Sequence, residues 1–336
     1  MFTLRYTHGM ARPLTLAAAA ISSALVGCAS HPAPDAALPE RTAALMVGDP
    51  APPIGTLTWL KGRGIDGFQE GHVYVIDFWA TWCSSCIAEF PDMSAVQREF
   101  QDRPVTIVSI SRPDTIGCTL DAATQFVASR EKDIAFDIGW DESRTTHTAY
   151  MKASGSGGIP CAFVVDTQGR IAAIGPGPAE LRKILPAVLD GSYDLAGATR
   201  AERLDRICQR DAQRFAALSK TDEPAAYAHL ARALEGPLWN DPGWLSVVVW
   251  EITSPARKQP DLAVADRVSR RALELTPARD NIDVLCSAAR LAHLRADDRT
   301  AVKLQERALE VNSANRVMIP SLTRDLDEYR KGAPGT

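Results

Sequence analysis

The sequence predicts an α/β fold, in which helices flank a mixed central sheet, followed by an all-α helical domain. Two observations carry this prediction. Between residues 46 and 195, short apolar runs rich in β-branched residues alternate with segments whose apolar residues recur every three or four positions. Between residues 196 and 330, strand-like runs disappear and the helical spacing continues. A length of 336 residues accommodates two domains of ordinary size.

The composition is that of an ordinary globular protein. Hydrophobic residues make up 46% and charged residues 23% of the chain. The 37 Lys and Arg residues against 41 Asp and Glu residues give a formal charge of −4. This mildly acidic balance offers no attraction for nucleic acid, so we expect no such partner. Seven cysteines are too few to build a disulfide scaffold of this size.

Residues 1–28 have the features of a lipoprotein signal peptide. Arg5 and Arg12 form a positively charged start, and Leu14–Val26 is an Ala-rich apolar run too short to span a bilayer comfortably. The run ends in Leu25-Val26-Gly27-Cys28, which resembles the lipobox of bacterial lipoproteins. The resemblance implies lipidation at Cys28, and the alternative is an ordinary cleaved signal with a coincidental cysteine.

A lipid on Cys28 implies a protein of the bacterial cell envelope, anchored to a membrane and facing the periplasm or extracytoplasmic side. Residues 29–45 are rich in Ala and Pro, which favours a flexible tether between the membrane and the first domain. No later run reaches 18 apolar residues, so the sequence predicts no second membrane element.

The α/β domain, residues 46–195, is expected to hold four strands. Val73–Trp79 and Val105–Ile110 are apolar β-rich runs that suit central strands. Two shorter runs, 162–165 and 171–174, flank a turn-like Asp-Thr-Gln-Gly-Arg segment and predict a hairpin. Helical spacing lies between these runs, at Ile87, Phe90, Met93, Val96 and Phe100 and at Leu181, Ile184, Leu185 and Val188.

The C-terminal domain, residues 196–330, is expected to consist of paired helices. Helical spacing covers residues 222–234, 262–275, 282–294 and 301–311. The segment Ala-Leu-Glu-Leu-Thr-Pro that begins at Ala272 is echoed 36 residues later by Ala-Leu-Glu-Val-Asn at Ala308. This offset resembles the tetratricopeptide repeat (TPR), although an irregular helical bundle stays open because the turn at Ala296 lacks a glycine.

The strongest functional signal is a Cys-x-x-Cys pair, Cys83-Ser84-Ser85-Cys86, that follows a strand and opens a helix. At a helix N-terminus, unpaired N–H groups and the helix dipole stabilise a thiolate, which is the attacking species in disulfide exchange. We therefore expect Cys83 to be the exposed, attacking thiol and Cys86, one turn further on, to resolve the mixed disulfide. A zinc site would need a second ligand pair, which the sequence lacks, so no metal is predicted.

These cysteines, together with Gly158-Ile159-Pro160 before a strand, resemble the thioredoxin superfamily over about residues 47–193. The resemblance implies that Pro160 is cis and faces the cysteines. The backbone of Ile159 would then pair with an extended substrate, and Trp82, beside Cys83, would belong to the same substrate-binding surface. An ordinary trans-proline at a strand start is the alternative for Pro160.

Two acidic residues fit the same resemblance. Asp77 lies inside an apolar strand, where burial should raise its pKa, and thioredoxins carry at the matching position an acid that serves proton transfer to the inner cysteine. Glu89 and Pro91 complete a Cys-x-x-Cys-x-x-Glu-x-Pro spacing that resembles the TlpA and ResA branch, in which the Glu tunes the cysteine pair. An exposed strand carboxylate and a solvated helix carboxylate are the respective alternatives.

The chain departs from this family at two points. Ser84-Ser85 replaces the common Gly-Pro, which restores a backbone N–H and adds hydroxyls near the thiolate. Because these donors stabilise the thiolate and hence the reduced form, we expect a more oxidising couple. Cys161 follows Pro160 and is expected near the dithiol, as an auxiliary thiol, a metal ligand or a small buried residue. Of the other cysteines, Cys118 should lie at the same end of the sheet, and a disulfide between Cys208 and Cys286 stays open.

The resemblance implies a membrane-anchored thiol-disulfide oxidoreductase that exchanges electrons with protein thiols and disulfides. Its only redox group would be the Cys83–Cys86 disulfide, with no further cofactor. A membrane thiol carrier of the DsbD or CcdA kind is the implied electron donor for a reductase, and apocytochrome c maturation is an implied role.

The sequence leaves three other functions as alternatives. A thiol peroxidase resembles Pro-x-x-x-Thr-x-x-Cys around its thiol, but the matching positions hold Ile76 and Ala80. A copper-handling protein of the Sco type spaces its cysteines by three residues and adds a distal His, whereas here the spacing is two and His147 is the candidate for that His. A non-enzymatic interaction module, with the helical domain as its active part, stays the third alternative.

Overall fold

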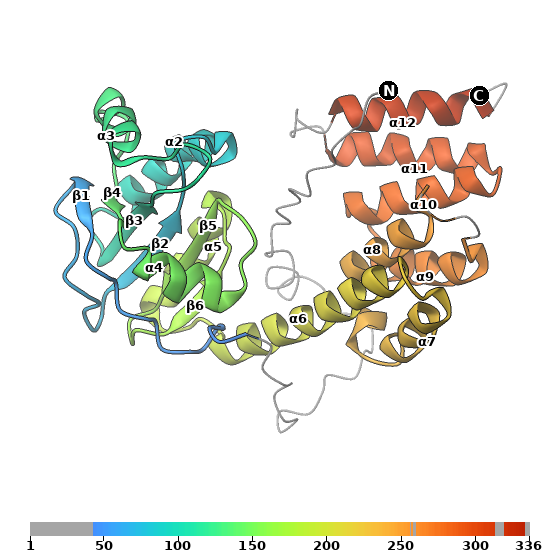
Figure 1. Ribbon diagram of the computed structural model, residues 1–336, viewed down its shortest axis with the longest axis horizontal. Coiled ribbons are helices and arrows are strands. Elements are labelled where there is room, and N and C mark those ends of the chain that lie inside the picture. The colour runs from blue at the N-terminus through green and yellow to red at the C-terminus, as the bar shows by residue number, and fades with distance from the viewer. Residues whose placement is uncertain (1–42, 256, 258–259, 313–318, 333–336) are drawn as a thin grey trace. The chain divides into compact units, whose positions relative to one another are not determined.

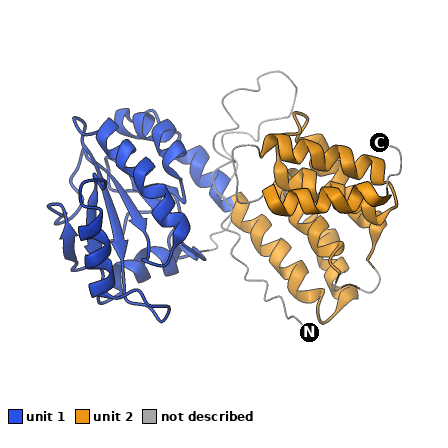
Figure 2. Cartoon of the chain, turned by 90° about the horizontal axis from the view of Figure 1, so that it is seen from above, with its two compact units in different colours: residues 1–203 blue, residues 204–336 orange. Residues whose placement is uncertain are grey.

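The computed structural model describes residues 43–255, 257, 260–312 and 319–332. The chain divides into two compact units, residues 1–203 and 204–336, which are coloured separately in Figure 2. We call their described parts the α/β unit and the helical unit. The expected signal peptide, its Cys28 and nearly all of the tether lie outside the described residues. Among the described residues, no helix is both long and apolar enough to cross a membrane.

The α/β unit is built on a six-stranded sheet in the order β1-β4-β3-β2-β5-β6 (Figure 1). The strands are β1 (Thr58–Lys61), β2 (Val73–Phe78), β3 (Val105–Ser111), β4 (Asp137–Trp140), β5 (Cys161–Val165) and β6 (Ile171–Ile174). Strands β2, β3 and β4 run parallel, whereas β1, β5 and β6 each run antiparallel to the neighbour that they join. This mixed sheet with flanking helices confirms the predicted fold class.

The central strand β2 is buried along its whole length, and its side chains alternate between two hydrophobic clusters. Val73 and Val75 face the cluster formed with α2 (Ser84–Glu99), α3 (Leu120–Ser129) and α5 (Pro178–Asp190). Tyr74, Ile76 and Phe78 face the opposite cluster, which includes residues of the short α4 (Thr145–His147) and η2 (Thr148–Lys152) region. The first of these two faces carries the cysteine pair.

Strands β1 and β4, which pair antiparallel to each other, were not predicted from the sequence. Each has only four residues, and neither is linked to a neighbouring strand by a turn signal like the one that revealed the equally short β6. An added Cβ at Gly139 would lie 2.8 Å from a methyl carbon of Leu57, so a larger residue there would force the Leu57 side chain to shift. This close packing involves residues far apart in sequence, so no local pattern reveals it.

The helical unit contains helices that pack mainly on their neighbours in sequence, as Figure 1 shows for α10, α11 and α12. The helices are α6 (Leu195–Leu218), which begins in the α/β unit, α7 (Glu223–Ala233), α8 (Pro242–Ile252), α9 (Leu262–Leu275), α10 (Ile282–Leu294), α11 (Asp298–Val311) and α12 (Ile319–Gly332). Helices α9 and α11 both have 14 residues, and their starts lie 36 residues apart, as the sequence echo predicts. The predicted TPR-like helical region is therefore present.

The helices of this unit begin at capping side chains that the sequence supplies at each start. Helices α7 to α11 are each preceded by an Asp or Asn whose side chain accepts a backbone N–H of the first turn: Asp222, Asp241, Asp261, Asn281 and Asp297. Such a cap satisfies donors that have no partner inside the helix, and each typically contributes about 1 kcal/mol. These caps fix where each helix starts.

Helix α6 begins at the boundary that we expected between the domains, but its first turns pack with the α/β unit. Leu195 and Ala198 contact the cluster on the Phe78 face of the sheet. The carboxylate of Glu202 accepts a hydrogen bond of 2.6 Å from the backbone N–H of Val47. The chain accordingly divides after residue 203, inside α6.

Candidate active site

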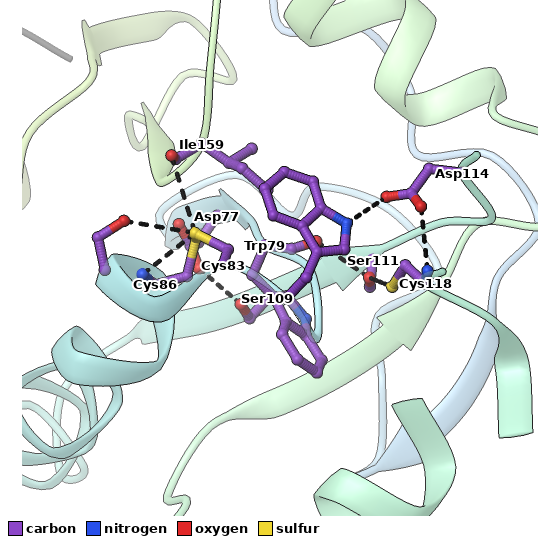
Figure 3. The surroundings of a disulfide bond; sticks show 11 residues. Asp77, Trp79, Cys83, Cys86, Ser109, Ser111, Asp114, Cys118 and Ile159 are labelled. Carbon is purple, nitrogen blue, oxygen red and sulfur yellow. Dashed lines mark hydrogen bonds between the residues drawn. A yellow bond between two sulfur atoms is a disulfide. The ribbon is translucent and has the colours of Figure 1, made fainter. Parts of the chain in front are cut away.

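Cys83 and Cys86 form a disulfide at the start of α2, with an S–S distance of 1.98 Å (Figure 3). Cys83 is the N-cap of this helix, and its sulfur accepts a hydrogen bond of 3.2 Å from the backbone N–H of Cys86. The first turn of α2 contains no acidic residue that would compete for the helix N-terminus. A thiolate on Cys83 would therefore meet unpaired N–H groups and the positive end of the helix dipole.

Both sulfurs are buried in the oxidised protein, which corrects the expectation that Cys83 is exposed. Cys83 keeps 4% and Cys86 2% of their surface. The Cys83 sulfur lies 3.8 Å from the carbonyl oxygen of Ile159 and 3.5 Å from the hydroxyl of Ser85. The two cysteines therefore differ through their positions at the helix start rather than through exposure.

The peptide bond between Ile159 and Pro160 is cis, as the resemblance implies. It lies just before β5, so that the Ile159 carbonyl is directed at the Cys83 sulfur (Figure 3). Trp82, which directly precedes Cys83 in the sequence, is 44% exposed. Cys83 thus adjoins an exposed aromatic residue in sequence, and its sulfur lies near the Ile159 carbonyl in space.

The ring of Trp82 is held by Asp114, a residue that the sequence analysis did not single out. The Trp82 indole N–H donates a hydrogen bond of 2.6 Å to Oδ2 of Asp114. The other oxygen, Oδ1, accepts the backbone N–H groups of Ile116, Gly117 and Cys118, and Figure 3 shows the bond from Cys118. Although burial alone would raise the pKa of Asp114, these hydrogen bonds lower it, so the carboxylate stays ionised. In the sequence, the one feature that marks Asp114 is its place directly after Pro113, a pair that is common in turns.

Asp77 projects from β2 on the face that α2 covers, and it is only 7% exposed. Its Oδ2 accepts a hydrogen bond of 2.6 Å from the hydroxyl of Ser109 on β3 (Figure 3). Burial raises the pKa of Asp77 to about 7, against the opposing effect of Ser109, and the charge of Glu89 adds to the rise. A carboxyl that titrates near neutral pH can take and return a proton there.

Glu89 lies on α2, one turn beyond Cys86, and its side chain is half-buried. Burial is the main cause that raises the pKa of Glu89, and the neighbouring charge of Asp92 adds to it. Because Glu89 also raises the pKa of Asp77, the two carboxyls are electrostatically linked. The structure thus brings together Cys83, Cys86, Asp77, Glu89, Trp82, Ile159 and Pro160.

The remaining cysteines with described positions are buried, and none of them is part of a disulfide. Cys161 pairs with Phe78 across the sheet and packs in the Phe78 cluster, whereas Cys83 and Cys86 pack in the cluster on the other face. Its side chain therefore lies on the opposite face of the sheet from the dithiol, and it is a small buried residue, which is one of the three expected alternatives. Cys118 lies on the dithiol face, where its sulfur contacts the hydroxyl of Ser111 at 3.2 Å. Cys208 and Cys286 belong to separate clusters and are not paired.

His147, the candidate histidine for a copper site of the Sco type, lies on the Phe78 face. Its ring stands edge-on to Phe78, with ring centroids 6.0 Å apart. Burial, followed by the charges of Arg112 and Lys152, lowers the pKa of His147 to about 4. Among the described residues, no group of three or more His, Cys, Asp or Glu side chains is arranged to hold a metal ion.

The α/β unit is similar in sequence to proteins of a known family. The model of the AhpC/TSA family matches residues 47–174. Protein FixW of Rhizobium leguminosarum is 35% identical over 159 residues, which cover 46% of this chain and 72% of that protein. The thiol-disulfide oxidoreductase ResA of Oceanobacillus iheyensis is 29% identical over 115 residues, which cover 34% of this chain and 55% of ResA.

Two solved structures are also similar. A thiol:disulfide interchange protein of the thioredoxin family from Chlorobium tepidum is 24% identical and has a TM-score of 0.35, covering 42% of this chain and 96% of that chain. The thioredoxin domain of a thiol-disulfide oxidoreductase from Bacteroides vulgatus is 21% identical and has a TM-score of 0.36, covering 43% of this chain and 99% of that chain.

Proposed function

Because this chain belongs to the AhpC/TSA family and, within it, to the ResA-like thiol-disulfide oxidoreductases, we propose that it exchanges electrons with client proteins through the Cys83–Cys86 pair. The observation that carries this proposal is the disulfide itself, placed at the N-terminus of α2. The Ile159 carbonyl lies 3.8 Å from its attacking sulfur. This arrangement joins a stabilised thiolate to a backbone segment on which an extended client can pair.

In the direction of client reduction, the Cys83 thiolate attacks one sulfur of a client disulfide and the other client sulfur leaves as a thiolate. Cys86 then gives up its proton to the Asp77 carboxylate, and its thiolate attacks the Cys83 sulfur. The mixed disulfide breaks, the second client sulfur leaves, and Cys83–Cys86 is the product. Two electrons pass from the enzyme dithiol to the client disulfide, so the enzyme ends oxidised. Glu89 tunes this step through its charge on Asp77.

The proposed location is the bacterial cell envelope, with a lipid on Cys28 as the membrane anchor. The support is the signal-like segment 1–28 and its ending Leu-Val-Gly-Cys. The resemblance to the TlpA and ResA branch supports a membrane thiol carrier of the DsbD or CcdA kind as the source of electrons. Labelling of Cys28 with a radioactive fatty acid in the native host would test the anchor, and its absence in an otherwise exported protein would contradict it.

The proposed chemistry is tested by trapping the mixed disulfide. We expect Cys86→Ala to accumulate disulfide-linked client adducts, since the resolving thiol is missing, whereas Cys83→Ala should form none. Both variants should lose insulin reduction. Cys118→Ala removes a buried free thiol that the mechanism does not use, and it should behave as the unsubstituted chain. Adducts that form on Cys83→Ala instead would reverse the roles of the two cysteines.

A further inference from the structure

Ser109 is the residue most closely tied to the buried carboxyl of Asp77. The two residues are partners in the parallel pairing of β2 with β3, and the Ser109 hydroxyl donates to Oδ2 of Asp77 at 2.6 Å. Ser109 is fully buried. A hydrogen bond between two such side chains is shielded from water, so that no solvent molecule replaces it when it is lost.

Ser109 is a polar residue on a face of β3 whose preceding positions are apolar. On the α2 face of β3, Val105 and Ile107 precede it and pack into the cluster that holds the two active cysteines. A hydroxyl at the next position on this face is costly to bury unless it has a partner. Its partner is Asp77, which indicates that the serine serves the carboxyl rather than the packing of the strand.

We propose that Ser109 is a positioning residue for proton transfer at the dithiol, which fixes the Asp77 carboxyl by donating to Oδ2 and leaves Oδ1 to exchange the proton of Cys86. This inference rests on the proposed function, in which Asp77 accepts that proton. An oxygen that already accepts an O–H donor is the weaker base of the two. The proton therefore resides on Oδ1, and the hydroxyl holds the carboxyl in one orientation through each cycle.

Among the residues that the structure describes, Ser109 is the side chain that donates a hydrogen bond to Asp77. From α2, the titratable groups on this face are Glu89 and the two active cysteines. From β5, the residue opposite Asp77 is the neutral Ala162. From α5, the side turned to the sheet is apolar, with Leu181, Leu185 and Val188. The remaining donor to the carboxyl is the backbone N–H of Phe78.

The first measurement follows the Asp77 carboxyl carbon by NMR in the oxidised full-length chain as pH is varied. Ser109 stabilises the ionised carboxyl, so Ser109→Ala should move the titration midpoint upward by about one pH unit. Ser109→Thr keeps a hydroxyl and should return the midpoint to that of the unsubstituted chain. Ser111→Ala is the matched control, because Ser111 lies two residues further on the same face of β3 and bonds to the carbonyl of Trp79 and to Cys118, not to Asp77.

The second measurement is the rate at which a preformed mixed disulfide on Cys83 breaks down, as a function of pH. With a midpoint one unit higher, Ser109→Ala should lower this rate at pH 7 about fivefold and recover it at higher pH. In the Asp77→Asn background, Ser109→Ala should have no further effect, because the two residues act as one unit.

The outcomes separate the inference from the function on which it rests. If Asp77→Asn leaves the pH profile of breakdown unchanged, the proton-accepting role of Asp77 fails and the role of Ser109 fails with it. If Asp77→Asn abolishes the profile while Ser109→Ala moves neither the NMR midpoint nor the profile, the inference on Ser109 alone is overturned. An equal shift in Ser111→Ala would also overturn it, since that shift would report a general change in the sheet.

Discussion

At the scale of single residues, the buried carboxyl of Asp77 should make the stability of the oxidised protein depend on pH. Its pKa is about 7 in the folded protein against 3.8 for an unperturbed group. Because the folded state holds this proton more tightly, the stabilisation is fully present below pH 4 and is lost as pH rises through 7. Asp77→Asn removes the dependence, so its stability relative to the unsubstituted chain should rise by a few kcal/mol between pH 4 and pH 8.

Denaturant unfolding of the oxidised chain at both pH values measures this difference. Asp102→Asn serves as the control, because Asp102 is an exposed carboxylate in the turn after α2. It should show the same pH dependence as the unsubstituted chain. A constant stability difference between Asp77→Asn and the unsubstituted chain across this range would mean that Asp77 is ionised in the folded state.

The sequence alone identified some residues of the site and missed others. Cys83, Cys86 and Asp77 stand in one continuous segment whose spacing carries the chemistry, so a local pattern was enough. Ser109 and Asp114 are 32 residues away from their partners Asp77 and Trp82. Nothing local distinguishes them, because their roles exist only after β3 has paired with β2.

At the scale of elements, the loop between β3 and α3 is organised by the carboxylate of Asp114. We expect Asp114→Ala to release both the Trp82 ring and three backbone N–H groups. The KM for a protein client should rise about tenfold, since a hydrogen bond to a charged group is worth about 1.5 kcal/mol. The rate with a small disulfide should stay the same, because it needs no docking surface.

The two substrates are compared in steady-state assays of the same preparations. Glu131→Ala, an exposed carboxylate beyond the other end of α3, is the control and should affect neither substrate. An equal loss on both substrates with Asp114→Ala would show that the loop supports the dithiol itself and has no specific part in client docking.

A second prediction at this scale concerns the turn between α10 and α11. Ala296 has a φ of +59°, in the left-handed region that glycine adopts at lower cost. Ala296→Gly should therefore stabilise the chain by up to about 1 kcal/mol. Ala292→Gly, four residues earlier inside α10, should destabilise it by a similar amount. Thermal unfolding of both variants measures the contrast, and a destabilised Ala296→Gly would contradict the assigned strain.

The elements themselves were predictable where a pattern persisted for long enough. Strands β2 and β3 and helices α9 to α11 extend over six to fourteen residues and were found from periodicity. Strands β1 and β4 were missed because each has only four residues and no turn signal links it to a neighbouring strand, whereas the equally short β6 was found from the turn that joins it to β5. Helix α6 was also missed, although the start of the helical region was placed close to its first residue. The 36-residue offset predicted the spacing of α9 and α11 because the two similar sequence segments lie in equivalent helices.

At the scale of the whole molecule, the two units are joined through one helix whose start belongs to the α/β unit. Thr199 is buried and lies against Gly48, and Glu202 binds the backbone of Val47. A cut at residue 193, where the thioredoxin resemblance ends, would remove these contacts. A cut at residue 203 keeps them and still removes the helical unit.

Two truncated chains therefore test what the helical unit contributes. The chain that ends at Arg203 should fold and should reduce insulin at close to the rate of the full chain, because the dithiol, Asp77 and Ile159 all lie before the cut. The chain that ends at Tyr193 should be less stable, since it loses the bond to Val47 and the contacts of Leu195 and Ala198. Stacked helix pairs present extended surfaces for binding, so the Arg203 chain should also capture fewer native clients when it carries Cys86→Ala. Client adducts at the level of the full chain would mean that the helices serve a purpose other than client binding.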